Sequence, residues 1–107
     1  MFLSRLALVT SLGFAAFPAA SHEFWLEARE YQVQPGAELA TNIKNGQIFE
    51  GTNLAYFANR TDRFDLTFEG KTLPYQARMG DSPALQMAAP RRDGLLIIAH
   101  EASASSL

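Results

Sequence analysis

The two histidines of the chain, His22 and His100, are the residues best suited to bind a transition metal. If proteolysis frees His22 as a new N-terminus, that residue supplies both an α-amine and an imidazole. The amine and Nδ1 can then close a chelate ring on a divalent metal, provided that both nitrogens are deprotonated. Imidazole suits nickel and copper, and affinity along the divalent series peaks at copper. His22 is therefore one candidate ligand, and Glu23 could add an oxygen.

His100 is the second candidate ligand. It follows the apolar run 94–99 and precedes Glu101. A strand end is a place where a side chain can leave the core and reach a site. Each histidine also has a plainer interpretation: His22 as simply the first residue of the mature chain, and His100 as a half-buried residue hydrogen-bonded to backbone.

Other chemistries are poorly supported by the composition. The chain has no cysteine, which excludes disulfides, thiolate metal sites and a cysteine nucleophile. It carries a net charge of −2 and no basic block, so we expect no nucleic-acid partner. Phosphate-binding glycine loops are absent, and the C-terminal serines lack the context of a hydrolase triad. The sequence therefore predicts a binding protein rather than an enzyme.

Residues 1–21 read as a signal peptide. Arg5 is followed by an apolar run, 6–17, of roughly a dozen residues, which is short of the roughly 20 that span a bilayer. Ala19 and Ser21 then provide the small residues that signal peptidase requires. We expect a signal-peptide helix, cleavage before His22 and a periplasmic mature domain, 22–107.

Alternating apolar and polar residues dominate the mature chain, which predicts β-strands. In 38–44 this pattern places Leu39, Thr41 and Ile43 on one face, and in 63–69 it points Phe64, Leu66 and Phe68 inward. The continuous apolar run 94–100 predicts a strand that is covered on both faces. Shorter candidate strands are 23–27, 31–34, 54–57 and 72–77.

Turn residues separate these strands at short intervals. The predicted turns include Pro35-Gly36, Asn45-Gly46, Glu69-Gly70 and the segment 80–83. In that last segment we expect Asp81 to cap the turn, with a hard-cation ligand as the alternative. Trp25, Tyr56, Phe57 and Tyr75 are expected to anchor the core.

These patterns predict an all-β fold, an immunoglobulin-like or transthyretin-like antiparallel sandwich. The sequence stops at Leu107, soon after the apolar strand. A strand in that position would be an exposed sheet edge, which native sheets usually protect. We therefore expect this sandwich to be incomplete, the N-terminal part of a longer domain.

The leader followed by His22-Glu23-Phe24-Trp25-Leu26 resembles the start of the domain-of-unknown-function 4198 family. The similarity continues through Pro35-Gly36, the Gly80-Asp81-Ser82-Pro83-Ala84 turn and Ala99-His100-Glu101. The resemblance implies an exported β-sandwich protein of the NikM-like group, which is associated with nickel or cobalt uptake. It also implies a chain of roughly twice this length.

Together these observations predict a periplasmic protein that binds nickel or cobalt, with copper as the alternative, through His22, His100 and Glu23. The metal would be passed to a membrane transporter. The competing hypothesis is an immunoglobulin-like module that binds a protein or a carbohydrate without metal. A copper monooxygenase could also use an N-terminal histidine, but the sequence shows no platform of exposed aromatic residues for a substrate.

Overall fold

The computed structural model describes residues 23–48 and 50–104, and within these ranges the regular secondary structure consists mainly of antiparallel strands. The strands are β1 (Glu23–Ala28), β2 (Glu38–Gln47), β3 (Glu50–Leu54), β4 (Thr61–Phe68), β5 (Lys71–Pro74), β6 (Leu85–Ala88) and β7 (Leu96–Ala102). A 3-10 turn, η2 (Ala58–Arg60), precedes β4. In the described ranges no helix is long and apolar enough to cross a bilayer. The all-β prediction is confirmed.

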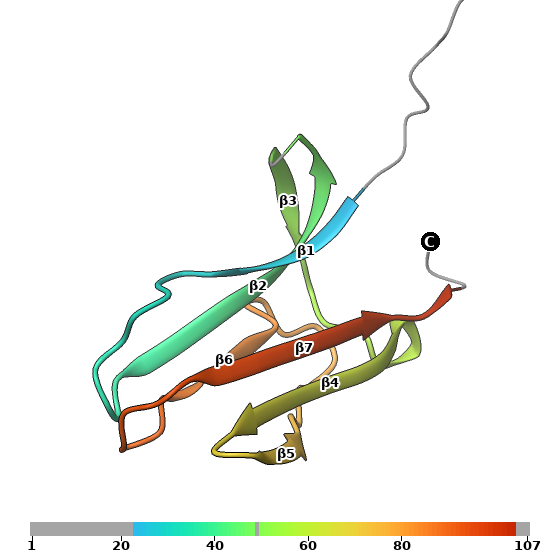
Figure 1. Ribbon diagram of the computed structural model, residues 1–107. Helices are drawn as coiled ribbons and strands as arrows, with labels where there is room; N and C mark the ends of the chain where they lie inside the picture. Colours follow the sequence, from blue (N-terminus) through green and yellow to red (C-terminus); the bar gives the residue numbers. More distant parts are fainter. Residues whose placement is uncertain (1–22, 49, 105–107) are drawn as a thin grey trace, which may run out of the picture.

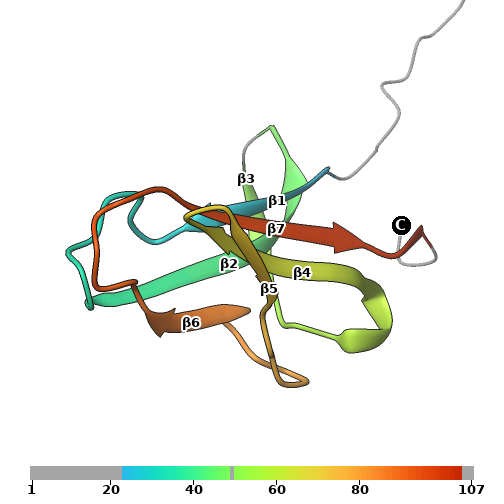
Figure 2. The same cartoon turned by 60° about the horizontal axis from the view of Figure 1, so that its bottom comes forward.

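The strands form two sheets. In the first, β2 is the long central strand: β1 pairs with one of its edges, and β3 and β6 share the other. The second sheet has the order β5-β4-β7. In Figure 1, β1 and β2 lie above β7 and β4, and Figure 2 shows β6 beside β2.

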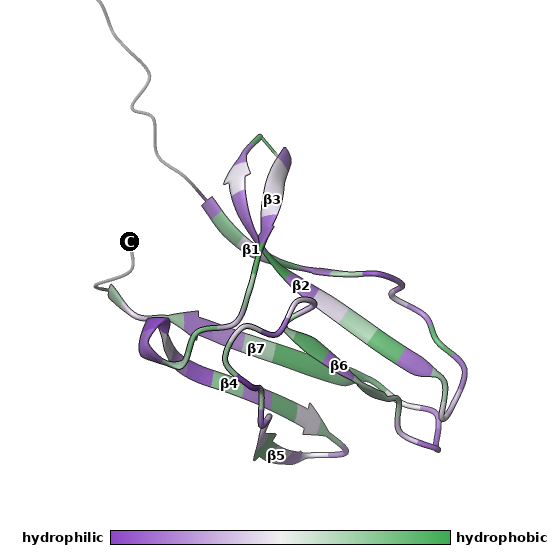
Figure 3. Cartoon of the chain, turned by 180° about the vertical axis from the view of Figure 1, so that it is seen from behind, coloured by the Kyte–Doolittle hydropathy of each residue, from purple (hydrophilic) through white to green (hydrophobic). Residues whose placement is uncertain are grey.

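Apolar side chains from both sheets share one core. Its buried members from the first sheet are Leu39, Ile43 and Leu85, together with Ala84 just before β6. Phe64 of β4 is the buried member from the second sheet. Partly buried residues complete it, among them Leu26, Leu66, Leu96 and Ile98. Figure 3 shows the corresponding apolar stretches on β2, β6 and β7. Full burial of such a side chain contributes roughly 1.5–3 kcal/mol, so this core supplies much of the stability.

The strongest alternating patterns predicted their strands correctly. The segment 38–44 lies in β2, and 63–69 lies in β4 except for Glu69. Leu39, Thr41 and Ile43 are buried on one face as expected. The candidates 23–27 and 72–77 correspond to β1 and the shorter β5, whereas 54–57 overlaps β3 only at Leu54. The strand β6 was not predicted, since four residues are too few to show a clear period.

Three expectations about burial and extent are wrong. The run that forms β7 is covered on one face only, because Leu95 is 75% exposed and Ile97 is 49% exposed. Residues 31–34 form no strand, and Tyr31 is 79% exposed. Trp25 is half-buried on the face of β1 opposite Leu26, so it does not anchor the shared core.

The predicted turn at Asn45-Gly46 is also wrong, because both residues lie inside β2. Gly46 faces Gly51 across the β2–β3 ladder. A Cβ added to Gly46 would sit 1.9 Å from the Glu50 carbonyl oxygen. The glycine therefore permits a close approach of two backbones rather than a change of direction.

Other predicted turns are confirmed. Glu69 and Gly70, with φ of 52° and 78°, join β4 to β5 in the manner of a two-residue hairpin turn. The amide of Ala37 donates to the Gln34 carbonyl across Pro35-Gly36. Asp81 caps its turn as expected, since its Oδ2 accepts from the Arg78 amide at 2.9 Å.

Tyr75 connects β6 to the segment that follows β5. Its hydroxyl accepts from the Gln86 amide at 3.0 Å and donates to the Gln86 carbonyl at 3.1 Å. Its ring packs edge-on against Phe64, with centroids 5.2 Å apart. Tyr75 thus belongs to the core, as predicted, and also satisfies both backbone groups of one residue on β6.

Candidate functional site

His100 lies on the inner face of β7, the face turned toward the other sheet. It stands two residues beyond Ile98, which packs against the core, and pairs across the ladder with the buried Phe64. The two rings meet edge to face, with centroids 5.2 Å apart and planes at 86°. Contact with a buried ring fixes the plane of the imidazole.

Thr61 approaches His100 because β4 is irregular at its start. The register of β4 on β7 shifts between Thr61 and Arg63. In a regular strand Thr61 and Phe64 would point to opposite faces, since they are three residues apart. The bulge instead sets Thr61 opposite Ala102 and turns its hydroxyl to within 3.1 Å of His100 Nε2.

The hydrogen bonds of Thr61 determine how His100 carries its proton. Thr61 Oγ1 donates its one hydrogen to the Phe57 carbonyl, 3.0 Å away. The same oxygen can therefore only accept from His100, whose Nε2 must hold the ring proton. Burial lowers the pKa of His100 below its ordinary value of 6.5, which keeps the ring neutral near pH 7. The lone pair is then on Nδ1, and a neutral imidazole with a free lone pair is the form that binds a metal.

A small cavity of about 130 Å³ opens beside His100. Residues of both sheets line it, and most of them are apolar. The lining side chains are Phe24, Ile43, Asn45, Leu54, Ala55, Phe57, Arg60, Thr61, His100 and Ala102.

Asn45 is a polar residue of this cavity that we did not predict. Its Oδ1 is shielded from solvent and has no hydrogen-bond partner among the described residues. The signal was present in the sequence, because Asn45 continues the inward alternation of Leu39, Thr41 and Ile43 by one more step. The assignment of Asn45-Gly46 to a turn led us to overlook this inward-facing position.

The three predicted ligands have different outcomes. His100 lines the cavity. Glu23 is exposed at the start of β1, one residue from Phe24, so its side chain leaves the strand on the face away from the cavity that Phe24 lines. His22 lies outside the described residues, and within them no group of three or more His, Cys, Asp or Glu side chains could hold a metal.

Within the described residues the cavity offers a metal few donors and no carboxylate. It combines a neutral imidazole nitrogen with a buried, unpartnered amide oxygen. Arg60 opposes a cation through its charge, but it is exposed and its guanidinium lies over the Phe57 ring, 5.4 Å from the centroid. Solvent screening weakens the repulsion that such an exposed charge exerts.

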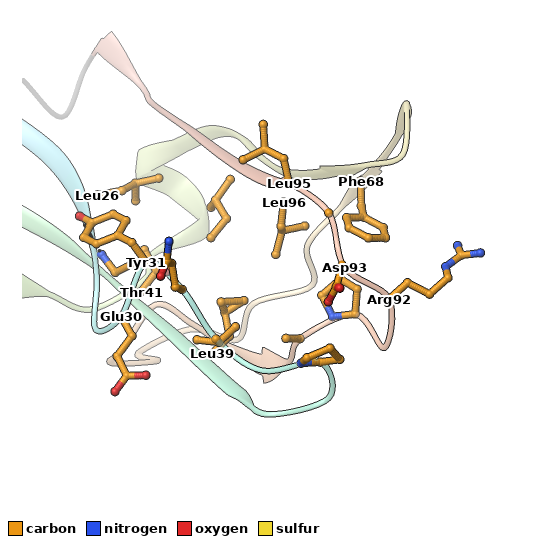
Figure 4. Close-up of a pocket in the computed structure, with 18 residues that line it drawn as sticks. Leu26, Glu30, Tyr31, Leu39, Thr41, Phe68, Arg92, Asp93, Leu95 and Leu96 are labelled. Carbon is orange, nitrogen blue, oxygen red and sulfur yellow. Dashed lines mark hydrogen bonds between the residues drawn. The ribbon is translucent and has the colours of Figure 1, made fainter.

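A larger cavity of about 460 Å³ lies beside the small one. Its walls are mainly apolar and include Leu26, Leu39, Phe68, Leu96 and Ile98. In Figure 4 the charged ends of Glu30 and Arg92 point away from these apolar side chains. Thr41 is the buried polar residue here: it is 2% exposed, and its hydroxyl has no partner among the described residues.

Comparison with known proteins adds no relative to this description. No protein-family model matches the sequence, and neither a curated protein nor a solved structure matches the chain.

Proposed function

We propose that the mature chain is an exported periplasmic protein that binds nickel or cobalt, with copper as the alternative, and delivers it to a membrane transporter. The supporting observation is the neutral imidazole of His100, which faces a cavity that the start of β1 also lines through Phe24. The N-terminal amine and imidazole of His22 would supply the remaining nitrogens.

The proposal makes one geometric demand on the N-terminus. Residues two apart share a face of an extended chain. His22 must therefore point to the same side as Phe24, which extended backbone through residue 22 would provide. Glu23, on the opposite face of β1, is not required as a ligand.

Isothermal titration calorimetry tests the proposal. A chain beginning at His22 is titrated with nickel chloride at pH 7.5, where the imidazoles are neutral and the amine begins to be deprotonated. We expect micromolar affinity, and a marked loss in His100→Ala. The matched control keeps the residues before His22, which blocks the α-amine and should weaken binding in the same way.

Absence of micromolar binding by the chain that begins at His22 would overturn the proposal. Mass spectrometry of the exported protein provides an independent check, because it identifies the processed N-terminus. An N-terminus at any residue other than His22 would remove the chelating amine.

The alternative proposal is an immunoglobulin-like or transthyretin-like module that binds a protein or carbohydrate without metal. The larger apolar cavity and the exposed side chain of Leu95 beside it favour this reading. If His22→Ala and His100→Ala leave cellular metal accumulation unchanged while a partner is still captured, this alternative is correct.

A further inference from the structure

The strand β7 forms an open border of the second sheet. It pairs with β4 on one side, and no other strand that the structure describes pairs with its far side. Figure 1 shows β7 at this border, next to β4. The backbone N–H and C=O groups of alternate residues along β7 therefore point away from the sheet, where a further strand can bind them.

Three other border strands carry features that discourage such pairing. The strand β5 has four residues and includes Lys71 and Pro74. The strand β6 also has four residues, and the Tyr75 hydroxyl bonds both backbone groups of Gln86. The strand β1 carries two exposed glutamates. By contrast, β7 has seven residues and contains no proline, glycine or lysine.

Exposed apolar side chains accompany the open edge of β7. Ile97 is 49% exposed on its outer face, and Leu95, which immediately precedes the strand, is 75% exposed. Glu101 is the one acidic residue of the strand. A long, apolar and unprotected edge is the kind that pairs with a strand of another chain.

We propose that β7 is a dimer interface, at which it pairs antiparallel with β7 of a second copy of this chain. Two three-stranded sheets then become one continuous sheet, in the order β5-β4-β7-β7-β4-β5. This inference is independent of the proposed metal binding.

A second copy suits this edge because the contact closes on itself. The same edge is used in both chains, related by a two-fold axis, so neither copy keeps an open β7 edge. The joined sheet ends on each side in β5, whose Lys71 and Pro74 oppose further growth. The pairing therefore stops at two copies.

The charge of Glu101 indicates the register. A pairing centred on Ala99 joins all seven residues of both strands and sets Glu101 of each copy opposite Ile97 of the other. A pairing centred on Ile97 would instead set Glu101 opposite Asp93, and one centred on Glu101 would set the two glutamates opposite each other. Like charges directly opposite are destabilising, so the register centred on Ala99 is favoured.

Disulfide cross-linking of the full chain tests the contact and its register. The chain has no cysteine, so one introduced thiol reports one position. Residues directly opposite in an antiparallel pair have Cα atoms about 4.5–5.5 Å apart, which a disulfide can span. Ala99→Cys should form a covalent dimer under mild oxidation. The matched control, Leu73→Cys, places an exposed thiol on β5 at the other border of the sheet and should cross-link far less.

Sedimentation equilibrium of the full chain gives a second readout, with a dimer that dissociates on dilution. Ile97→Glu should weaken the dimer about tenfold, because two new pairs of like charges face each other across the interface. Ile97→Lys should dimerise more tightly than Ile97→Glu, since its charge is opposite to that of Glu101. Leu73→Glu is the matched control and should leave the dimer unchanged. All variants share the same N-terminal residues, so differences between them report the β7 edge.

The outcomes are distinct from those of nickel titration. A parent chain that stays monomeric at every concentration overturns the inference. A dimer that Ile97→Glu leaves intact, or in which Ala99→Cys cross-links no better than Leu73→Cys, also overturns it. If Ile97→Glu does not fold, the cross-linking of Ala99→Cys decides.

Discussion

The two cavities lie one after the other along the same three strands, yet their chemistry differs. Passing from the large cavity to the small one, β1 contributes Leu26 and then Phe24, β2 contributes Thr41 and then Asn45, and β7 contributes Ile98 and then His100. Each cavity is lined by one residue, Thr41 or Asn45, whose buried oxygen has no partner among the residues that the structure describes. The orphaned oxygen is thus common to both cavities.

What distinguishes the small cavity is the imidazole of His100 in its lining. There His100 Nε2 is bonded to Thr61 and its ring packs against Phe64, which assigns the lone pair of the neutral ring to Nδ1. The large cavity around Thr41 is lined by apolar side chains and also by Tyr31, Gln32 and Asp93, but by no imidazole. The charged ends of Glu30 and Arg92 point outward (Figure 4). A single buried polar atom is therefore weak evidence for a site, and convergence of several is stronger evidence.

The largest effect should come from the buried core residue against which His100 packs beside the small cavity. Phe64 is 5% exposed and contacts Tyr56, Tyr75 and His100. Phe64→Ala should lower the free energy of unfolding by about 3–5 kcal/mol, because it opens a cavity in the core. Urea unfolding followed by circular dichroism measures this.

The matched variant is Phe68→Ala on the wall of the large cavity. Phe68 is only half-buried, so we expect a smaller loss, about 1–2 kcal/mol. If Phe64→Ala does not fold, Phe64→Leu provides the measurable comparison. Equal losses of stability at the two positions would contradict the expected effect of the difference in burial between Phe64 and Phe68.

A gain in stability is expected at the orphaned oxygen of the large cavity. Thr41→Val replaces the buried hydroxyl with a methyl group of similar size, and it should raise the free energy of unfolding by about 1–2 kcal/mol. The control is Thr67→Val, whose hydroxyl is bonded to Thr72 Oγ1 at 2.7 Å and which should show no gain. Destabilisation by Thr41→Val would mean that its hydroxyl has a partner, such as an ordered water.

A smaller, pH-dependent effect should be confined to the small cavity. Burial lowers the pKa of His100 below 6.5, so the unfolded chain binds a proton more readily than the folded one. The stability of the metal-free protein should therefore fall as the pH drops through 6.5 toward the lower pKa of the folded state.

Thermal unfolding between pH 7.5 and pH 5.5 in the presence of a chelator measures this dependence. His100→Gln should flatten it, because glutamine does not titrate, and His22 is the same in both chains. An equal slope in the parent and His100→Gln would show that His100 does not cause the loss.

The smallest effect is expected outside both cavities, at the rim of the large one. Arg92 pairs there with Glu69, and both side chains are substantially exposed. Exposed ion pairs contribute about 0–1 kcal/mol, so Arg92→Ala should change the midpoint of urea unfolding very little. A loss as large as that of Phe68→Ala would indicate that the pair supports the cavity wall.

The sequence predicted the fold class because alternation is a strong signal in strands with one buried face. It placed β2 and β4 well for this reason. It failed for β7, since an apolar run does not reveal whether a second layer covers its outer face. It also failed at Asn45-Gly46, where a dipeptide typical of turns serves a close contact between β2 and β3.

Only part of the candidate site was accessible from the sequence. His100 was identified by its residue type and its place at the end of an apolar run. Thr61 could not be identified in this way, because its approach to His100 depends on a bulge that the local sequence pattern does not predict. Asn45 could have been found by continuing the alternation of β2, but the turn interpretation took precedence. The roles of His22 and Glu23 remain predictions.

The Tyr75 hydroxyl has a consequence for self-association of the protein. By accepting from the amide and donating to the carbonyl of Gln86, it occupies the two groups through which another strand would pair at that residue of β6. The Tyr75 hydroxyl therefore blocks the addition of a further strand at this point of the edge, which is a common route to aggregation for exposed edge strands. Tyr75 therefore protects the edge of β6 at Gln86 from strand pairing, in addition to packing in the core.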